Sequence, residues 1–195
     1  MLKARNRAWV LSSWQVVVGE YAKMGKEIKI TTIPYEFKGF MGMRNFIIQD
    51  SEGRKLAWAN SNWTHLDIST GLPARLTPAD TDNYVLGEKM EMDYAPRKIK
   101  LPEDMIAQEA FTVQKHHLDT NHHVNNCQYV CMAEDFLPES FKIYQMRAEY
   151  KMQAKLGDVI CPKVKTETDK VVVSLDNIEG KAYAIVEFLK KEGDI

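Results

Sequence analysis

Four runs of β-branched and aromatic residues fill the first half of the chain, and they limit its fold more than any other feature. Such runs are typical of strands, and glycines separate them. The expected strands are residues 9–18, 27–34, 41–50 and 56–67, with turns at Gly25, Gly39 and Gly53. Ser-Glu-Gly-Arg at residues 51–54 predicts a hairpin turn, and Thr-Pro-Ala-Asp at residues 77–80 predicts the cap of a short helix. The first half is therefore expected to form a sheet.

The second half contains a change of period between residues 111 and 137. Residues 111–116 alternate in the two-residue rhythm of a half-buried strand. After Asn121 the spacing becomes three and four residues, which predicts a helix to about Leu137, because Pro138 stops it. The apolar stripe of this helix is expected to contain Val124, Cys127, Tyr129, Val130 and Cys131. Further strands are expected at residues 144–153, 158–167, 170–176 and 183–189.

The turn between that strand and that helix holds a carboxylate, an amide and an imidazole, namely Asp119, Asn121 and His123. The first N–H groups of a helix lack intrahelical acceptors, so the amides near Val124 and Asn125 are candidates to stabilise an oxyanion. Asp119 and His123 are placed to orient or deprotonate a water. The alternative is that the Asp and Asn only form a turn and a helix cap.

Four of the five histidines lie close to this turn and raise the question of a zinc site. They are His116, His117, His122 and His123. Adjacent residues on an extended backbone point to opposite sides, and no cysteine or carboxylate has supporting spacing. A metal site is therefore not expected.

The cysteines and the overall composition limit the class of protein. Cys127, Cys131 and Cys161 are an odd number without metal-binding spacing, so we expect them to be reduced, and the first two to pack in the core. A chain of 195 residues with 45% apolar composition can bury a real core. The net charge of −1 gives no attraction to nucleic acid. Neither a membrane span nor the apolar core of a signal peptide is present, which predicts a cytoplasmic protein.

A weak internal repeat relates the two halves. Gly25 and Gly157 lie in similar segments 132 residues apart, and Gly53 and Gly180 lie in similar segments 127 residues apart. Each copy is expected to contain a turn, two strands, a second turn and another strand. The strand and helix that precede Gly157 have no counterpart before Gly25, so the first copy is expected to be incomplete at its N-terminus.

The run LDTNHHVNNCQY resembles the signature of acyl-acyl-carrier-protein thioesterases, Asp-x-Asn-x-His-Val-Asn-Asn-x-x-Tyr, in the second of two hotdog domains. A looser form of this pattern also occurs in single-hotdog acyl-CoA thioesterases. Three other stretches are similar to the bacterial branch of the acyl-acyl-carrier-protein thioesterase family: RNRAWVLSSWQ, FKGFMGMRNF and YAPRKIKLP. The resemblance covers nearly the whole chain.

The resemblance implies an α+β fold of two hotdog repeats, each an antiparallel sheet wrapped on a helix, with the N-terminal strand and helix of the first repeat absent. The implied boundaries are residues 1–87 for the first repeat, 88–104 for a connector and 105–195 for the second repeat with the catalytic motif. The implied activity is hydrolysis of a fatty acyl thioester on acyl carrier protein, in fatty acid biosynthesis, without metal or organic cofactor. Asp119, Asn121 and His123 are the implied catalytic residues, with backbone donors at Val124 and Asn125.

The chain departs from the family pattern after Glu149. Plant relatives read Glu-Tyr-Arg-Arg-Glu-Cys there, and their later Glu has been assigned a catalytic role, whereas this chain has Gln153 followed by Ala154. An amide can orient a water but cannot take its proton, so Gln153 is a candidate only for positioning. Asp119 and His123 must then carry more of the chemistry.

Several features keep alternatives open. The resemblance places the acyl chain in the first hotdog, so some of Trp9, Trp14, Trp58 and Trp63 either line its tunnel or only fill the core. Two basic groups are either solvated surface or contacts for an acidic carrier protein: Lys3, Arg5 and Arg7, and Arg97, Lys98 and Lys100. An acyl-CoA thioesterase and a non-catalytic acyl-binding hotdog remain alternatives, and a homodimer is left open.

Overall fold

The computed structural model describes residues 6–191, and its backbone contacts divide into two compact units. The first unit extends to Arg97 and the second begins at Lys98. Residues 88–97 of the expected connector therefore group with the first unit, and residues 98–104 with the second. Each unit is described by itself below.

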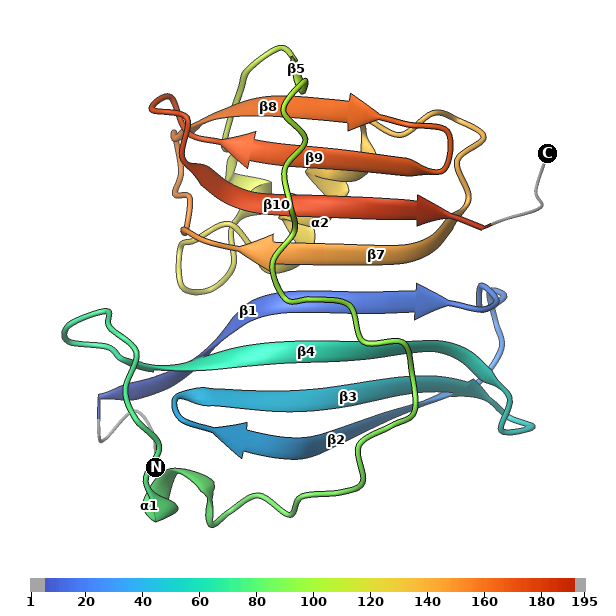
Figure 1. Ribbon diagram of the computed structural model, residues 1–195, viewed down its shortest axis with the longest axis vertical. Helices are drawn as coiled ribbons and strands as arrows, with labels where there is room; N and C mark the ends of the chain where they lie inside the picture. Colours follow the sequence, from blue (N-terminus) through green and yellow to red (C-terminus); the bar gives the residue numbers. More distant parts are fainter. Residues whose placement is uncertain (1–5, 192–195) are drawn as a thin grey trace. The chain divides into compact units, whose positions relative to one another are not determined.

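The first unit is an antiparallel sheet with the strand order β2-β3-β4-β1 (Figure 1). Its elements are β1 (Arg7–Val18), β2 (Ile28–Lys38), β3 (Met41–Asp50), β4 (Lys55–Asp67) and the short helix α1 (Pro78–Thr81). All four strands predicted from the sequence are confirmed, as is the short helix capped by Thr77. The hairpin turn after β3 is also confirmed, because the Asp50 carboxylate accepts hydrogen bonds from the amides of Glu52 and Arg54 at 3.0 and 2.9 Å.

Residues 88–97 follow the first sheet as irregular backbone, and two buried amide side chains bind them. Gln15 on β1 donates to the Asp93 carbonyl at 2.7 Å and accepts from the Ala95 amide at 2.9 Å. Asn45 on β3 accepts from the Met90 amide at 3.0 Å. These bonds satisfy polar groups that would otherwise be costly to bury, so this segment packs as part of the first unit.

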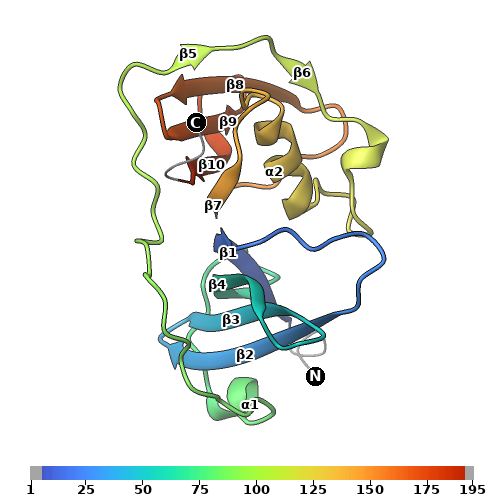
Figure 2. The same ribbon diagram turned by 90° about the vertical axis from the view of Figure 1, so that its right-hand side faces the viewer.

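The second unit is an antiparallel sheet with the order β7-β10-β9-β8-β5, and one helix lies against a face of it (Figure 2). Its elements are β5 (Ile106–Ala107), β6 (Phe111–Thr112), the 3-10 helix η2 (Lys115–His117), α2 (Asn126–Glu134), β7 (Ile143–Tyr150), β8 (Val159–Thr166), β9 (Lys170–Asp176) and β10 (Ala182–Lys190). The apolar side chains of β9 and β10 are almost completely buried, and α2 contacts both strands. This packing forms the core that supports the polar turn before α2.

Two predictions for the second unit are wrong in detail. The strand expected from Phe111 lasts only two residues before η2 begins. The helix buries Tyr129, Met132 and Ala133, whereas Cys127 and Cys131 are exposed. Residues two positions apart lie about 200° around a helix, so Cys127 and Tyr129 cannot share one stripe. The cysteines are therefore surface residues of α2 and not core residues.

Candidate active site

The motif forms a closed loop between η2 and α2. Leu118 and Val124 pair as an isolated antiparallel bridge, and inside it the Asp119 amide donates to the His123 carbonyl at 2.9 Å. The His122 amide donates to the Asp119 carbonyl at 3.1 Å, with His122 in the left-handed region at φ 61°. The loop therefore brings Asp119, Asn121 and His123 together on one tight turn.

Hydrogen bonds from within the loop hold the Asp119 carboxylate. Its Oδ1 accepts from the Asn121 amide N–H at 2.7 Å and from the His123 N–H at 3.3 Å, and its Oδ2 accepts from Asn121 Nδ2 at 3.3 Å. Desolvation raises the pKa of the Asp119 carboxyl, but the hydrogen bonds from Asn121 and His123 outweigh it and hold the pKa below its usual value. Asp119 is therefore an oriented anion at neutral pH.

The two side chains expected to act together do not form a direct pair. Among the described residues, no ion pair within 4 Å joins the Asp119 carboxylate to the His123 imidazole. His123 does contribute favourable electrostatics to the ionised form of Asp119. The carboxylate and the imidazole thus share the turn, with the carboxylate oriented by Asn121.

The backbone donors expected at Val124 and Asn125 are not free, contrary to the prediction. The Val124 amide donates to the Ala154 carbonyl and the Asn125 amide to the His117 carbonyl, both at 2.9 Å. Asn125 is the N-cap of α2, and its Oδ1 accepts from the Cys127 amide at 2.9 Å. Within residues 6–191, the amide at this helix start that has no acceptor is that of Asn126. The donor available to an incoming oxygen is therefore one residue later than expected.

Gln153 lies beside this turn because its neighbour Ala154 is fixed to both the loop and the helix. Ala154 is fully buried, its carbonyl accepts from the Val124 amide, and its amide donates to Tyr129 Oη at 2.8 Å. Gln153 itself is exposed and lies after the end of β7. The structure thus brings the backbone of Gln153 close to the motif, although the two are about thirty residues apart in sequence.

Two tyrosines of this region hold the helix in place. Burial raises the pKa of Tyr129 to about 12, and burial also raises the pKa of Tyr150 strongly. The Tyr150 hydroxyl donates to the Asn126 carbonyl at 3.1 Å, so it joins β7 to the first turn of α2. Tyr129 belongs to the sequence motif, but neither role was deduced from the sequence, since both depend on tertiary contacts.

His116 and His117, in η2, contact each other. His117 Nδ1 accepts a hydrogen bond from the Gln114 amide at 2.9 Å. Burial and the neighbouring His116 lower the pKa of His117. No group of three side chains that could hold a metal ion occurs in the part of the chain that the structure describes.

An apolar cavity of about 340 Å³ lies in the first unit. Aromatic rings dominate its lining, which includes Trp9, Phe37, Phe46, Trp63 and Tyr84. Arg44 also lines it and donates to the Thr32 hydroxyl at 2.7 Å. Of the four tryptophans, Trp9 and Trp63 line this cavity, whereas Trp14 packs on Phe46 with ring centroids 4.9 Å apart and Trp58 lies under Lys55.

The basic groups differ in their surroundings. Arg7 forms an ion pair with Asp67, whereas Arg97, Lys98 and Lys100 are exposed. Lys3 and Arg5 lie outside the described residues. In residues 6–191 no helix is both long and apolar enough to span a bilayer.

The two antiparallel sheets, with few helices, fit a hotdog-like fold that presents a polar turn at the start of its main helix. The chain belongs to the acyl-ACP thioesterase family. Residues 1–84 match the family model described as "Acyl-ACP thioesterase N-terminal domain", and residues 99–188 match the one described as "Acyl-ACP thioesterase C-terminal domain".

Among curated proteins, the chain is similar to the chloroplastic palmitoyl-acyl carrier protein thioesterase of Arabidopsis thaliana. The two are 25% identical over 168 residues, which are 80% of this chain and 40% of that protein. This chain therefore spans about two fifths of the length of the curated relatives it matches.

Two solved structures share the fold. An acyl-ACP thioesterase from Bacteroides thetaiotaomicron superposes with a TM-score of 0.87 at 19% identity, covering 97% of this chain and 79% of that one. The 12:0-ACP thioesterase from Umbellularia californica gives a TM-score of 0.84 at 18% identity, covering 97% of this chain and 77% of that one.

Proposed function

We propose that this protein hydrolyses the thioester of a fatty acyl chain on acyl carrier protein, releasing a free fatty acid and the carrier thiol. Membership of the family supports this proposal, and the named relatives act on acyl-ACP. The observation that carries it is the Asp119 turn, where an oriented carboxylate and an imidazole precede a helix with an unoccupied first amide. The aromatic cavity of the first unit supplies a site for an acyl chain.

In the proposed fold each unit is one hotdog repeat, residues 1–87 and 105–195, joined by residues 88–104. The strand orders support this, because β2-β3-β4-β1 and β8-β9-β10-β7 are the same order when each strand is matched with the strand numbered six higher. The repeated glycines support it as well, since Gly25 and Gly157 have φ of 79° and 85°, and Gly53 and Gly180 have φ of 83° and 76°. In the described part of the first unit, α1 is the only helix, so the first repeat has no counterpart of α2 there.

The proposed mechanism uses groups of the second unit. The Asn126 amide donates to the thioester oxygen as it becomes an oxyanion, at the positive end of α2. His123 deprotonates a water that Gln153 helps to orient, and the water oxygen adds to the carbonyl carbon. Collapse of the tetrahedral intermediate breaks the C–S bond, and the proton goes to the leaving sulfur. Asn121 keeps Asp119 oriented, and the Asp119 carboxylate stabilises the imidazolium that His123 forms when it takes the proton from water. Direct attack by Asp119, with an anhydride intermediate, is the competing mechanism.

The test is hydrolysis of acyl carrier protein thioesters with a panel of chain lengths, following both free fatty acid and free thiol. Wild-type protein should release the two products in equal amounts, and His123→Ala should abolish release while the fold is retained. His122→Asn is the matched control, because Asn tolerates the left-handed backbone at that position and keeps the loop intact. Equal turnover by wild type and His123→Ala would reject this mechanism.

Two alternatives follow from particular observations. The looser motif fits acyl-CoA thioesterases, so the same acyl chain should be compared on carrier protein and on coenzyme A. Gln153 in place of a Glu favours a non-catalytic acyl-binding protein, which would bind acyl carrier protein without releasing product. A cytoplasmic location and a homodimer remain predictions; centrifugation of the purified protein would test the second.

A further inference from the structure

His65 is a buried histidine of the first unit that the proposed reaction does not use. It lies on β4, is 0% exposed and pairs directly with Trp9 on β1. The two rings contact each other with centroids 5.0 Å apart. Because Trp9 lines the apolar cavity, His65 packs against one of the cavity's own wall residues.

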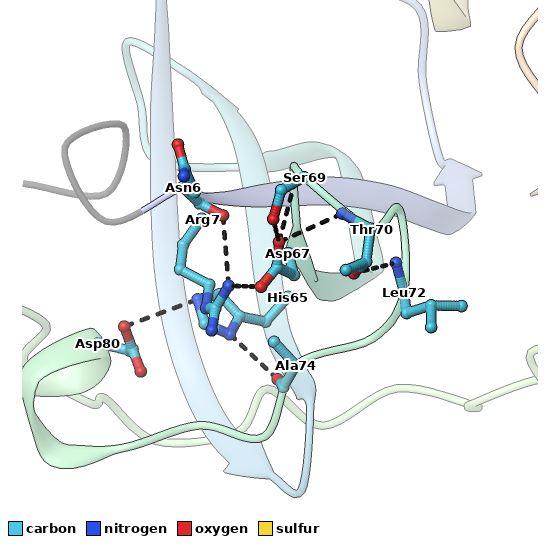
Figure 3. Close-up of polar contacts among 9 residues, drawn as sticks. All are labelled: Asn6, Arg7, His65, Asp67, Ser69, Thr70, Leu72, Ala74 and Asp80. Carbon is cyan, nitrogen blue, oxygen red and sulfur yellow. Dashed lines mark hydrogen bonds and ion pairs between the residues drawn. The ribbon is translucent and has the colours of Figure 1, made fainter.

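His65 also holds the segment that follows β4, which we name the strap (residues 74–84). Its carbonyl accepts from the Ala74 amide at 2.8 Å, and its Nδ1 lies 3.1 Å from the Ala74 carbonyl (Figure 3). A carbonyl oxygen only accepts, so Nδ1 carries the proton and Nε2 is the nitrogen that faces Asp80. The distance from Nε2 to Asp80 Oδ1 is 3.7 Å, and both side chains are buried.

Asp80 connects this histidine to α1. Its other oxygen, Oδ2, accepts from the Thr77 amide at 2.9 Å and from the Thr77 hydroxyl at 2.6 Å. Its Oδ1, the oxygen that faces His65 Nε2, lies within ion-pair distance of that nitrogen. The Asp80 side chain therefore both binds Thr77 at the start of α1 and faces His65.

The strap ends at Tyr84, which also lines the cavity. The Tyr84 amide donates to the Thr81 carbonyl at 2.9 Å, and its ring packs edge-on to Phe37 with centroids 5.4 Å apart. His65 thus contacts Trp9 directly and is connected to Tyr84 through Asp80 and α1. Two aromatic walls of one cavity depend on the same buried pair.

We propose that His65 and Asp80 are positioning residues that hold Trp9 and the strap in the arrangement that binds the acyl chain. The pair sets affinity for the chain and takes no part in bond breaking. This inference rests on the proposed function of the cavity as the acyl site, and it adds a determinant of binding that the catalytic motif does not contain.

The experiment compares wild type with Asp80→Ser and Asp80→Asn. Serine offers a hydroxyl to cap α1 but is too short to reach His65. Asparagine can accept from Thr77 through Oδ1 and donate to His65 Nε2 through Nδ2, which replaces the pair without a charge. Asp50→Ser is the matched control, because the Asp50 carboxylate accepts from amides of its own β3–β4 hairpin turn, in a different turn from that of Thr77 and Asp80. Binding of dodecanoate is followed by tryptophan fluorescence, and kcat and KM are measured on dodecanoyl-acyl carrier protein.

We expect Asp80→Ser to weaken dodecanoate binding and raise KM by roughly tenfold, with kcat within about twofold of wild type. Asp80→Asn should restore both values to near wild type, and Asp50→Ser should change neither. Unchanged binding in Asp80→Ser, failure of Asp80→Asn to rescue, or a fall in kcat without a rise in KM would each overturn the proposal. If wild type itself fails to bind dodecanoate, the acyl-site assignment fails first; if wild type binds and Asp80→Ser binds equally, only the positioning role fails.

Discussion

The first unit presents an aromatic cavity on its sheet, whereas the second unit packs a helix on its sheet and carries a polar turn at the start of that helix. The strand orders match, so the difference lies in what accompanies each sheet. In the second unit the ionisable motif residues depend on a buried core of β9, β10 and α2. In the first unit the cavity depends on a strap fixed by His65. The comparison predicts that changes in the second unit alter kcat and that changes in the first alter binding.

After the loss of release in His123→Ala, the largest expected effect is that of Asp119→Asn. The amide keeps an oxygen that can accept from the Asn121 and His123 amides, so the loop should persist while the charge is lost. We expect kcat to fall by roughly 10²- to 10⁴-fold with little change in KM. Steady-state kinetics measure kcat and KM, and circular dichroism checks that the variant keeps its fold. A change confined to KM would break the division of roles between the two units.

Tyr129→Phe should lower stability by about 1–3 kcal/mol, because the buried Ala154 amide loses its acceptor. Urea unfolding measures the change, and turnover should fall as well, since Ala154 aligns both Val124 and Gln153. Tyr150→Phe is the comparison variant. Its hydroxyl donates to the Asn126 carbonyl at 3.1 Å, a longer bond than the 2.8 Å bond of Tyr129, so its loss should cost about 1 kcal/mol or less. Equal costs for the two variants would contradict the proposed role of Ala154.

Gly42→Ala tests the cavity of the first unit. A Cβ at this position would lie 3.1 Å from atoms of both Trp9 and Phe37, so the methyl group removes space at the cavity wall. The preference should shift toward shorter acyl chains, by roughly tenfold in kcat/KM between long and short substrates. Competition between two chain lengths on acyl carrier protein measures the shift. An unchanged preference would indicate that the acyl chain does not contact this wall.

The strands could be predicted from sequence because alternation and turn residues such as Gly53 are local signals. The candidate catalytic residues were found through the motif, since Asp119, Asn121 and His123 lie within five positions. The occupied amides of Val124 and Asn125 could not be foreseen, because one acceptor is Ala154, which only the fold brings near. The same applies to His65 and Asp80. His65 lies in a strand that also buries Asn60 and Ser61, and the sequence carries no signal that distinguishes this histidine from those other buried polar residues.

Gln153→Ala should have a smaller effect than Asp119→Asn. The amide is assigned to orienting a water, and one neutral hydrogen bond is worth about 0.5–1.5 kcal/mol, so kcat should fall by no more than about tenfold. Gln153→Glu is the informative partner variant, because it restores a carboxylate that can accept a proton. A loss as large as that of Asp119→Asn would show that Gln153 does more than orient water, and would move it to the centre of the mechanism.

The smallest expected effect is that of Asp119 on the pH profile. Its pKa is lowered because hydrogen bonds from Asn121 and His123 outweigh desolvation. A carboxyl group whose pKa is lower in the folded than in the unfolded state stabilises the fold at pH above its unfolded pKa. This stabilisation is lost only as the pH falls through the pKa of the folded state. Asp119 should therefore stay ionised between about pH 5 and 8 and add no step to kcat there. Comparing the pH dependence of kcat for wild type and Asp119→Asn tests this, because the variant keeps measurable turnover; a step between about pH 5 and 8 that is present in wild type and lost in Asp119→Asn would contradict the prediction.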